Sequence, residues 1–228
     1  MSLKGKVAIV TGSGRGIGKS IAFCLAKEGC KVIVTSRTEK EINETVKEIQ
    51  SNGFGIVCDV SNYSSVKKLI SETIKRFGKI DILVNNAGVA VKKLFSETEK
   101  EEWDKIVDIN LKGAFNLTKE VLPLMLVQKS GKIINISSGA GKTGVPGLSI
   151  YSATKFGLIG FTQALAQEVE KDGVKIYSVC PGSTETKMYH DMFPGAEAVS
   201  KPEDIAQIVL KLCKSECDVE TGTAIDVY

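Results

Sequence analysis

Two side chains that could transfer a proton lie one helical turn apart in the segment YSATK. Tyr151 and Lys155 are spaced i, i+4, so both project from one face if this segment is helical. A free tyrosine has a pKa near ~10 and is a poor proton donor or acceptor at neutral pH. Because a neighbouring ammonium group favours the phenolate, the spacing predicts that Lys155 lowers the pKa of Tyr151 toward the working range.

A hydroxyl group that could stabilise negative charge follows the apolar run KIINIS. Ser138 comes directly after that run, where a strand would end. Such a hydroxyl can donate to a carbonyl oxygen that gains negative charge as a hydride arrives, and this help is greatest in a dry site. Both positions also have structural interpretations, with Ser138 satisfying a strand end and Tyr151 acting as a half-buried packing residue.

A glycine-rich stretch, TGSGRGIGKS at residues 11–20, follows the apolar run KVAIV and could bind phosphate in two ways. The first is the P-loop of nucleotide hydrolases, G-x-x-x-x-G-K-S/T, whose end is supplied by Gly18, Lys19 and Ser20. The match fails because Ser13 stands where the first glycine is required. No later strand ends in an acidic residue for magnesium, since ILVNNAG runs into two amides, so phosphoryl transfer is disfavoured.

The second possibility is the first turn of a dinucleotide-binding fold. Gly12, Gly16 and Gly18 have the spacing G-x-x-x-G-x-G, although Ile17 stands where G-x-G-x-x-G would place its last glycine. Glycines there permit a tight turn and a close backbone approach, and the pyrophosphate contacts free N–H groups at the N-terminus of the next helix. The glycines could also serve the turn alone, so this interpretation depends on the rest of the chain.

The elements that must position these residues are short strands that alternate with amphipathic helices. Strand-like runs rich in β-branched residues occur at residues 6–10, 31–36, 55–60, 81–86, 132–137, 175–180 and 223–228. This alternation predicts a parallel sheet, and runs that are apolar nearly throughout predict helices on both faces. We expect one α/β domain over residues 1–228, a doubly wound Rossmann-type fold with a seven-stranded, mostly parallel sheet. Ligands would bind at the carboxyl ends of its strands.

The composition argues against several kinds of partner and site. The 228 residues carry a formal net charge of +3, which gives no reason to expect nucleic acid or an anionic membrane as a partner. No apolar run is long enough for a signal peptide or a membrane span, which favours a cytoplasmic location. We expect no metal site, because His190 is the only histidine and the one close cysteine pair, Cys213 and Cys217, is not a C-x-x-C motif.

A set of motifs in a fixed order resembles the short-chain dehydrogenase/reductase family across essentially the whole chain. The motifs are TGSGRGIG in the glycine-rich stretch, CDV at 58–60, NNAG at 85–88, DIN ending at Asn110, NISS with Ser138, YSATK at 151–155 and PGSTET at 181–186. The resemblance points to 3-oxoacyl carrier-protein reductases and carbonyl reductases. It implies reversible hydride transfer between a nicotinamide cofactor and a small ketone or aldehyde, with a secondary alcohol as the reduced product.

The resemblance also implies a role for each motif. Ser138 would hold the substrate oxygen, Tyr151 would transfer the proton, and Lys155 would hydrogen-bond the nicotinamide ribose. Asn110 would hold a water molecule that links Lys155 to solvent. The implied cofactor-binding residues are Gly12, Ser13, Arg15, Gly16, Ile17, Gly18, Ser36, Arg37, Asp59, Val60, Asn86, Ala87, Gly88, Tyr151, Lys155, Pro181, Gly182, Thr184 and Thr186.

The residues after the second strand-like run predict NADP as the cofactor. Sites that prefer NAD usually place Asp or Glu about twenty residues beyond the glycines, where the carboxylate accepts from the ribose hydroxyls. Here Ser36 and Arg37 occupy that stretch, and Arg15 lies within the glycine-rich stretch. Two guanidinium groups could therefore face a 2′-phosphate, with no carboxylate to repel it.

The segment after PG is expected to fold over the substrate as a short lid near residues 183–200. Met188, Tyr189, Met192 and Phe193 would give this lid apolar contacts for a hydrophobic or acyl-type substrate, although they could equally pack the lid onto the domain. The family further implies a homo-oligomer, a dimer or tetramer, assembled through helices at residues 103–128 and 151–170. A non-catalytic NADP-binding sensor is the main alternative to an enzyme.

Overall fold

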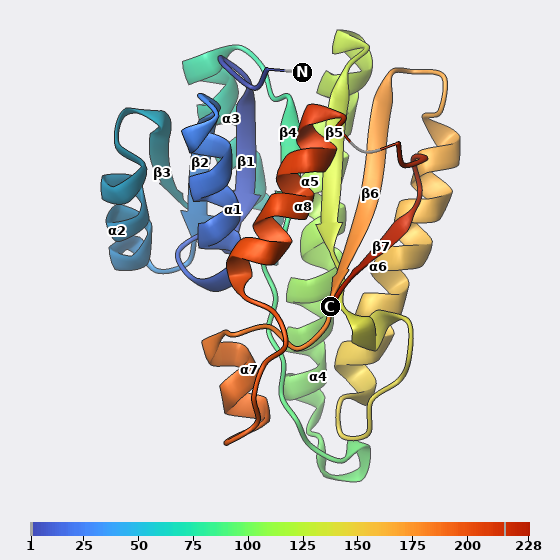
Figure 1. Ribbon diagram of the computed structural model, residues 1–228. Coiled ribbons are helices and arrows are strands. Elements are labelled where there is room, and N and C mark those ends of the chain that lie inside the picture. The colour runs from blue at the N-terminus through green and yellow to red at the C-terminus, as the bar shows by residue number, and fades with distance from the viewer. Residues whose placement is uncertain (1, 217) are drawn as a thin grey trace.

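The computed structural model describes residues 2–216 and 218–228, whose strands form a single parallel sheet of seven in the order β3-β2-β1-β4-β5-β6-β7 (Figure 1). The strands are β1 (Val7–Thr11), β2 (Lys31–Ser36), β3 (Gly53–Val57), β4 (Ile82–Asn85), β5 (Gly131–Ile136), β6 (Val174–Pro181) and β7 (Ala224–Val227). The predicted Rossmann-type sheet is confirmed. Cys217 lies outside the described residues, and with it the pair that it would form with Cys213.

Helical connections join successive strands. The α-helices are α1 (Gly16–Lys27), α2 (Glu39–Ile49), α3 (Tyr63–Phe77), α4 (Lys100–Val107), α5 (Gly113–Gln128), α6 (Ser149–Glu168), α7 (Lys187–Met192) and α8 (Pro202–Lys214). Shorter turns are η1 (Gln50–Asn52), η2 (Phe95–Glu97), the π-helical η3 (Asp108–Lys112) and η4 (Gly139–Gly141). The helix α7 lies within the segment expected to be a lid.

Both faces of the sheet are buried, which explains why the strands are apolar nearly throughout. Along β1, Ala8 and Val10 belong to the core beneath α1 and α8, whereas Ile9 belongs to the core beneath α3 and α5. Figure 1 shows α1 and α8 on the near side of the sheet and α5 behind it. Successive side chains of a strand point to opposite faces of the sheet, so β1 contributes residues to both hydrophobic cores.

The chain reverses its direction of winding between β1 and β4. It passes from β1 outward to β2 and β3, then crosses back to β4, which pairs with the other side of β1. The connections that leave the carboxyl ends of β1 and β4 therefore diverge, and this divergence opens a crevice at that edge of the sheet. The glycine-rich stretch follows β1 and the NNAG motif spans the end of β4, so both meet at the crevice.

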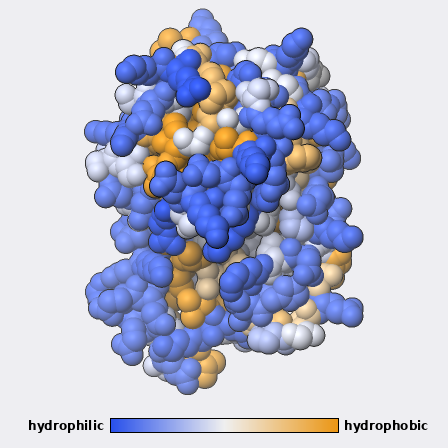
Figure 2. Space-filling model, turned by 90° about the vertical axis from the view of Figure 1, so that its left-hand side faces the viewer, coloured by the Kyte–Doolittle hydropathy of each residue, from blue (hydrophilic) through white to orange (hydrophobic). Residues whose placement is uncertain are grey.

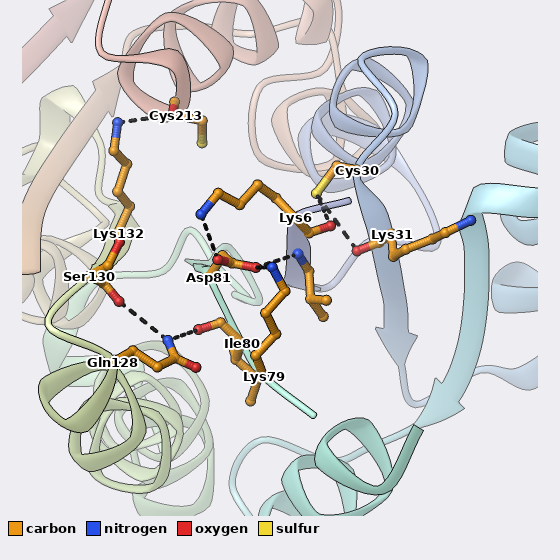
Figure 3. A network of polar contacts seen from close by, with 11 residues as sticks. Lys6, Cys30, Lys31, Lys79, Ile80, Asp81, Gln128, Ser130, Lys132 and Cys213 are labelled. Carbon is orange, nitrogen blue, oxygen red and sulfur yellow. Dashed lines mark hydrogen bonds and ion pairs between the residues drawn. The ribbon is translucent and has the colours of Figure 1, made fainter. Parts of the chain in front are cut away.

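A polar network closes the opposite, amino-terminal edge of the same two strands (Figure 3). The Asp81 carboxylate accepts hydrogen bonds from Lys6 Nζ at 2.8 Å and from the Val7 N–H at 2.9 Å, and its second oxygen lies 3.0 Å from Lys79 Nζ. Asp81 precedes β4, while Lys6 and Val7 lie at the start of β1. This carboxylate therefore fixes the amino ends of the two central strands against each other.

The face on the side of α2 and β3 is mostly hydrophilic, with small separate hydrophobic patches (Figure 2). The edge strand β3 is partly covered by side chains from α3: the Arg76 guanidinium lies 4.2 Å from the centroid of the Phe54 ring, and Phe77 packs edge-on against that ring. Within the described residues, no helix is long and apolar enough to cross a membrane.

Candidate active site

A cavity of about 720 Å³ lies at the carboxyl ends of the central strands. Nearly all the site residues predicted from the sequence line it, although they come from segments spread along the whole chain. The predicted residues in its wall are Gly12, Arg15, Gly16, Ile17, Gly18, Ser36, Arg37, Asp59, Val60, Asn86, Ala87, Gly88, Ser138, Tyr151, Lys155, Pro181, Gly182, Thr184 and Thr186. Ser13 and Asn110 are not among the residues that line it.

The glycine-rich turn packs tightly against the end of β4. Gly12 has a φ of +63°, and a Cβ atom there would lie 3.0 Å from Ala87 Cα. The Asn86 amide donates to the Thr11 carbonyl at 2.8 Å, and a side chain on Gly18 would overlap that amide. The turn therefore requires glycine for both its backbone conformation and its close approach to NNAG.

The N-terminus of α1 points its unpaired N–H groups toward this cavity. The helix begins at Gly16, and the side chain of its N-cap residue Arg15 makes no capping hydrogen bond. The first-turn N–H groups of a helix have no partner within the helix, and together with the helix dipole they favour an anion. Because Gly16, Ile17 and Gly18 line the cavity, this end can receive a pyrophosphate group.

Ser13 was predicted to bind the cofactor, but its side chain does not line the cavity. Its side chain is fully buried, donates to the Val10 carbonyl at 2.6 Å and accepts from the Thr35 N–H at 2.9 Å. The hydroxyl thus points into the protein, where it joins the end of β1 to β2. Ser13 therefore stabilises the glycine-rich turn from the side that faces the protein interior.

Tyr151, Lys155 and Ser138 lie together in the wall of the cavity, at the edge of the sheet. Tyr151 and Lys155 lie in the first two turns of α6, and Ser138 is the N-cap residue of η4, two residues beyond the end of β5. The Ser138 hydroxyl lies close enough to the Tyr151 phenol to affect its ionisation. The Lys155 ammonium group lies 5.5 Å from the centroid of the Tyr151 ring.

Lys155 is attached to the last residue of β5 through its side chain and to the residue after that strand through its main chain. Its Nζ donates to the Ile136 carbonyl at 2.7 Å, and its own carbonyl accepts from Ser137 Oγ at 2.9 Å. A Cβ atom on Gly141 would lie 2.8 Å from the Lys155 carbonyl, so η4 can approach α6 this closely only with glycine there. These contacts fix the position of α6 relative to Ser138.

Burial shifts the pKa values of the two titratable groups in this cluster. It raises the pKa of Tyr151, and the Ser138 hydroxyl acts in the opposite direction. The direction of this shift is opposite to the predicted one, because burial has the largest effect on the phenol. Burial lowers the pKa of Lys155 to about 8.

Asn110 does not line the cavity but stabilises its wall from the side of the protein interior. It lies in the π-helical turn η3 between α4 and α5 and is buried. Its amide accepts from the Val89 N–H at 2.8 Å, donates to the Val89 carbonyl at 2.9 Å and contacts Thr154 Oγ1 at 3.3 Å. The side chain thereby fixes the segment after NNAG relative to α6, while its predicted contact with a water molecule near Lys155 stays a prediction.

The far end of the cavity carries Arg15, Ser36 and Arg37, as predicted for a 2′-phosphate, but it also carries a carboxylate. Glu41 of α2 lines this end, and its Oε1 lies 3.3 Å from Arg15 Nη1. The prediction that no carboxylate lies here is wrong, because the helical turn after Arg37 brings Glu41 back toward the glycine-rich turn.

Sequence reasoning missed several apolar residues at the substrate end. Val145 and Leu148 come from the connection between η4 and α6, and Val89 and Ala90 follow NNAG. The only signal for them is the length of these connections beyond the carboxyl ends of β4 and β5. The four lid residues named from the sequence, together with Lys187, also line this end.

The two ends of the segment at residues 183–200, which the sequence predicts to be a lid, are joined to each other, and its middle contacts the segment after NNAG. Thr184 and Ser200 form a parallel bridge, with their hydroxyl groups 3.1 Å apart. The ring of Phe193 packs on Tyr189 with centroids 5.3 Å apart, and Lys92 Nζ lies 4.2 Å from the Phe193 centroid. Because Lys92 comes from the segment after NNAG, this contact bridges the two sides of the opening.

A parallel sheet of this order, with a glycine-rich turn at the crossover and a serine, tyrosine and lysine at the same edge, defines a Rossmann-type dinucleotide-binding protein. The chain belongs to the short chain dehydrogenase family, whose family model matches residues 6–197. It is therefore an oxidoreductase of this family. Over residues 2–216 and 218–228, no three histidine, cysteine or acidic side chains are arranged to hold a metal ion.

Similar proteins cover the whole chain. A 3-oxoacyl-(acyl-carrier-protein) reductase of Thermotoga maritima is 34% identical over 240 residues, covering 100% of this chain and 98% of that protein. The reductase of the same name from Vibrio cholerae is 38% identical over 237 residues, covering 100% and 97%. The crystal structure of 3-ketoacyl-(acyl-carrier-protein) reductase from Brucella melitensis complexed with NADH has a TM-score of 0.93 and 32% identity, covering 99% of this chain and 98% of that one.

Proposed function

We propose that this protein reduces the carbonyl group of a 3-oxoacyl thioester or a related ketone, with NADPH as the cofactor. The observation that carries the proposal is that Ser138, Tyr151 and Lys155 line the same cavity as the glycine-rich turn, with the Lys155 ammonium group beside the Tyr151 ring. The names of the relatives support the 3-oxoacyl class of substrate.

The residues at the glycine-rich end fit a dinucleotide. The first-turn N–H groups of α1 would hold the pyrophosphate. Arg15 and Arg37 would contact the 2′-phosphate, and Lys155 would contact the nicotinamide ribose. When bound, the nicotinamide supplies a hydride to the carbonyl carbon.

The three side chains at the other end would bind the carbonyl oxygen of the substrate and protonate it. Ser138 donates a hydrogen bond to the carbonyl oxygen as negative charge develops on it. Tyr151 transfers its proton to the same oxygen, which completes the alcohol. Because burial raises the pKa of Tyr151, the phenol stays protonated at neutral pH, as a proton donor for reduction must.

Lys155 stabilises the phenolate that remains after this transfer. With a pKa of about 8, its amine is mostly protonated at neutral pH, and the ammonium group lies 5.5 Å from the centre of the Tyr151 ring. Both groups are shielded from water, so their attraction is stronger than it would be in solvent. The positive charge of Lys155 thus favours the proton transfer.

The lid and the apolar wall opposite it would hold the acyl part of the substrate. Met188, Met192 and Phe193 face the cavity from the lid, and Val145 and Leu148 face it from the connection before α6. Flexible methionine side chains adapt to acyl chains of different length. This arrangement supports a hydrophobic substrate in preference to a sugar or polyol.

We also infer a homo-oligomer assembled through α5 and α6. Phe115 of α5 and Phe156 of α6 are 37% and 46% exposed, and Phe115 packs against Phe161 on the neighbouring helix. Large aromatic residues that share one exposed helical surface are typical of subunit interfaces. Sedimentation velocity of wild type and Phe156→Glu would test this assembly, with a shift toward monomer expected for the variant.

The catalytic assignment is tested by NADPH absorbance with acetoacetyl thioesters, diketones and quinones as substrates. Tyr151→Phe keeps the ring but removes the proton, so kcat is expected to fall by about 10²–10⁴-fold while the Kd of NADPH stays within about twofold. Normal turnover by this variant would overturn the role of Tyr151. Failure of wild type to reduce any carbonyl, with NADPH still bound, would favour the sensor.

A further inference from the structure

Glu41 is the one acidic side chain of the described residues that lines the cavity between Arg15 and Ser36. Its Oε1 lies 3.3 Å from Arg15 Nη1, and its side chain is 29% exposed, against 70% for Arg15. The carboxylate is thus the more sheltered partner of this pair, whereas the guanidinium group reaches farther into solvent. Arg37 lies at the same end of the cavity, so Glu41 is the acidic member of a basic cluster.

The position of Glu41 is set by contacts between α2 and the glycine-rich turn. One turn further along α2, the buried Thr45 donates to the Gly14 carbonyl at 3.3 Å. On the next turn Glu48 pairs with Lys19 of α1 at 2.8 Å. Residues i and i+4 lie on one helical face, so these contacts place Glu41 beside the turn that would hold the cofactor.

Gly14 allows the carboxylate to come this close. A Cβ atom on Gly14 would lie 2.7 Å from Glu41 Cβ and 3.0 Å from Glu41 Oε2, and 3.4 Å from Ser36 Oγ. Any other residue at position 14 would therefore push Glu41 away from Arg15. The pair depends on a glycine that stands between the two residues in space.

We infer that Glu41 competes with the 2′-phosphate of NADP for Arg15 and so limits the preference of this protein for NADP over NAD. The inference rests on the proposed function, because it assumes a nicotinamide dinucleotide in the cavity. A 2′-phosphate that contacts Arg15 must replace the carboxylate, and the two anions then repel each other. With NAD, the same carboxylate can accept a hydrogen bond from the ribose 2′-hydroxyl.

The size of the effect follows from the exposure of the pair. An exposed ion pair and the repulsion between partly solvated anions are each modest, so we expect removal of the Glu41 charge to tighten NADP binding about three- to tenfold. The gain should shrink as salt screens the charges, because Arg15 is mostly in solvent.

Isothermal titration of wild type and Glu41→Gln with four ligands tests the inference. Adenosine 2′,5′-bisphosphate and AMP report the adenosine end alone, and NADP⁺ and NAD⁺ report the whole cofactor. Glu39→Gln is the matched control, because it removes the same charge from the first turn of α2 at a position that does not line the cavity. Thermal melting of each variant checks that the fold is kept.

The expected result is tighter binding of NADP⁺ and the bisphosphate to Glu41→Gln, with AMP and NAD⁺ both unchanged or weaker, and no such change in Glu39→Gln. In an Arg15→Ala background, the gain from Glu41→Gln should shrink. Equal changes for ligands with and without the 2′-phosphate, an equal effect of Glu39→Gln, or a full gain without Arg15 would each overturn the inference. If wild type bound neither dinucleotide, the proposed function would fail as well, which is a distinguishable outcome.

Discussion

The Ser138 hydroxyl lies beside the Tyr151 phenol, although the two residues belong to elements that are separate in the chain, the start of η4 and the first turn of α6. This contact holds the predicted oxygen-binding group and the predicted proton donor at one point on the edge of the sheet. Because the Ser138 hydroxyl acts to lower the pKa of Tyr151 against the larger effect of burial, we expect Ser138 to influence both the substrate and the tyrosine.

Ser138→Ala is expected to lower kcat by about 10²–10³-fold, since the carbonyl oxygen loses a preorganised donor. The pKa of Tyr151 should rise in this variant, which would move the alkaline limb of the pH profile upward. Steady-state kinetics across pH provides the measurement. Ser149→Ala, an exposed serine of α6 outside the cavity wall, is the control and should match wild type.

Lys155→Met should change how stability depends on pH. The pKa of Lys155 is about 8 in the folded protein, below its ordinary value of 10.5, so the unfolded chain binds more protons between these values. The free energy of unfolding of wild type should therefore rise relative to the variant by about 3 kcal/mol as the pH increases from 8 to 10.5. Urea unfolding at several pH values measures this difference, in which the other titrating groups cancel; parallel curves would contradict the expectation.

Asp81→Asn should destabilise the protein without changing its chemistry. Burial alone would raise the pKa of Asp81, but the hydrogen bonds from Lys6, Val7 and Lys79 hold it below the usual value. The stabilisation is therefore present above the unfolded pKa, near ~4, and is lost as pH falls through the folded value. We expect a loss of about 2–4 kcal/mol at pH 7 in urea unfolding, and a smaller difference in acid.

Two comparisons sharpen this prediction for Asp81. Asp104→Asn removes a carboxylate whose pair with Lys100 is exposed, so it should cost less than about 0.5 kcal/mol. Asp81 lies at the edge of the sheet opposite the cavity, so kcat/KM of the Asn variant should equal that of wild type below its unfolding temperature. A loss of activity in the folded variant would show that the two edges are coupled.

Phe193→Ala should weaken the binding of long acyl thioesters. The ring packs on Tyr189 and lies under Lys92 Nζ, so its removal breaks the contact that bridges the opening of the cavity. A cation–π contact of this kind corresponds to a rise in KM of about two- to fivefold, with kcat for a short substrate unchanged. Val199→Ala, in the same segment but outside the cavity wall, provides the control; an equal effect of both variants would argue against the lid.

The sequence allowed the sheet and most of the cavity to be predicted because both depend on local signals. Apolar β-branched runs separated by helical periods specify a parallel sheet, and the i, i+4 spacing of Tyr151 and Lys155 places them on one face of a helix whatever else the chain does. Gly12 and Gly18 were identifiable because only glycine fits a turn so close to its neighbours.

The predictions that were wrong concern features that depend on tertiary contacts. The inward orientation of Ser13 depends on the Thr35 N–H of the neighbouring strand, and the position of Glu41 depends on contacts of α2 with Gly14. The direction of the pKa shift of Tyr151 depends on burial, which no spacing of residues reveals. Charge and hydrogen-bond geometry at the cavity therefore had to come from the structure.

Because the Lys155 ammonium group bonds the end of β5 and its carbonyl bonds the residue after that strand, the first turns of α6 have little freedom to shift when substrates of different bulk arrive. Substrates of different size would then be accommodated by the segment that follows β6. Changes in that segment would alter which substrates bind without moving the side chains expected to transfer the proton, so substrate selectivity and turnover rate can be engineered separately.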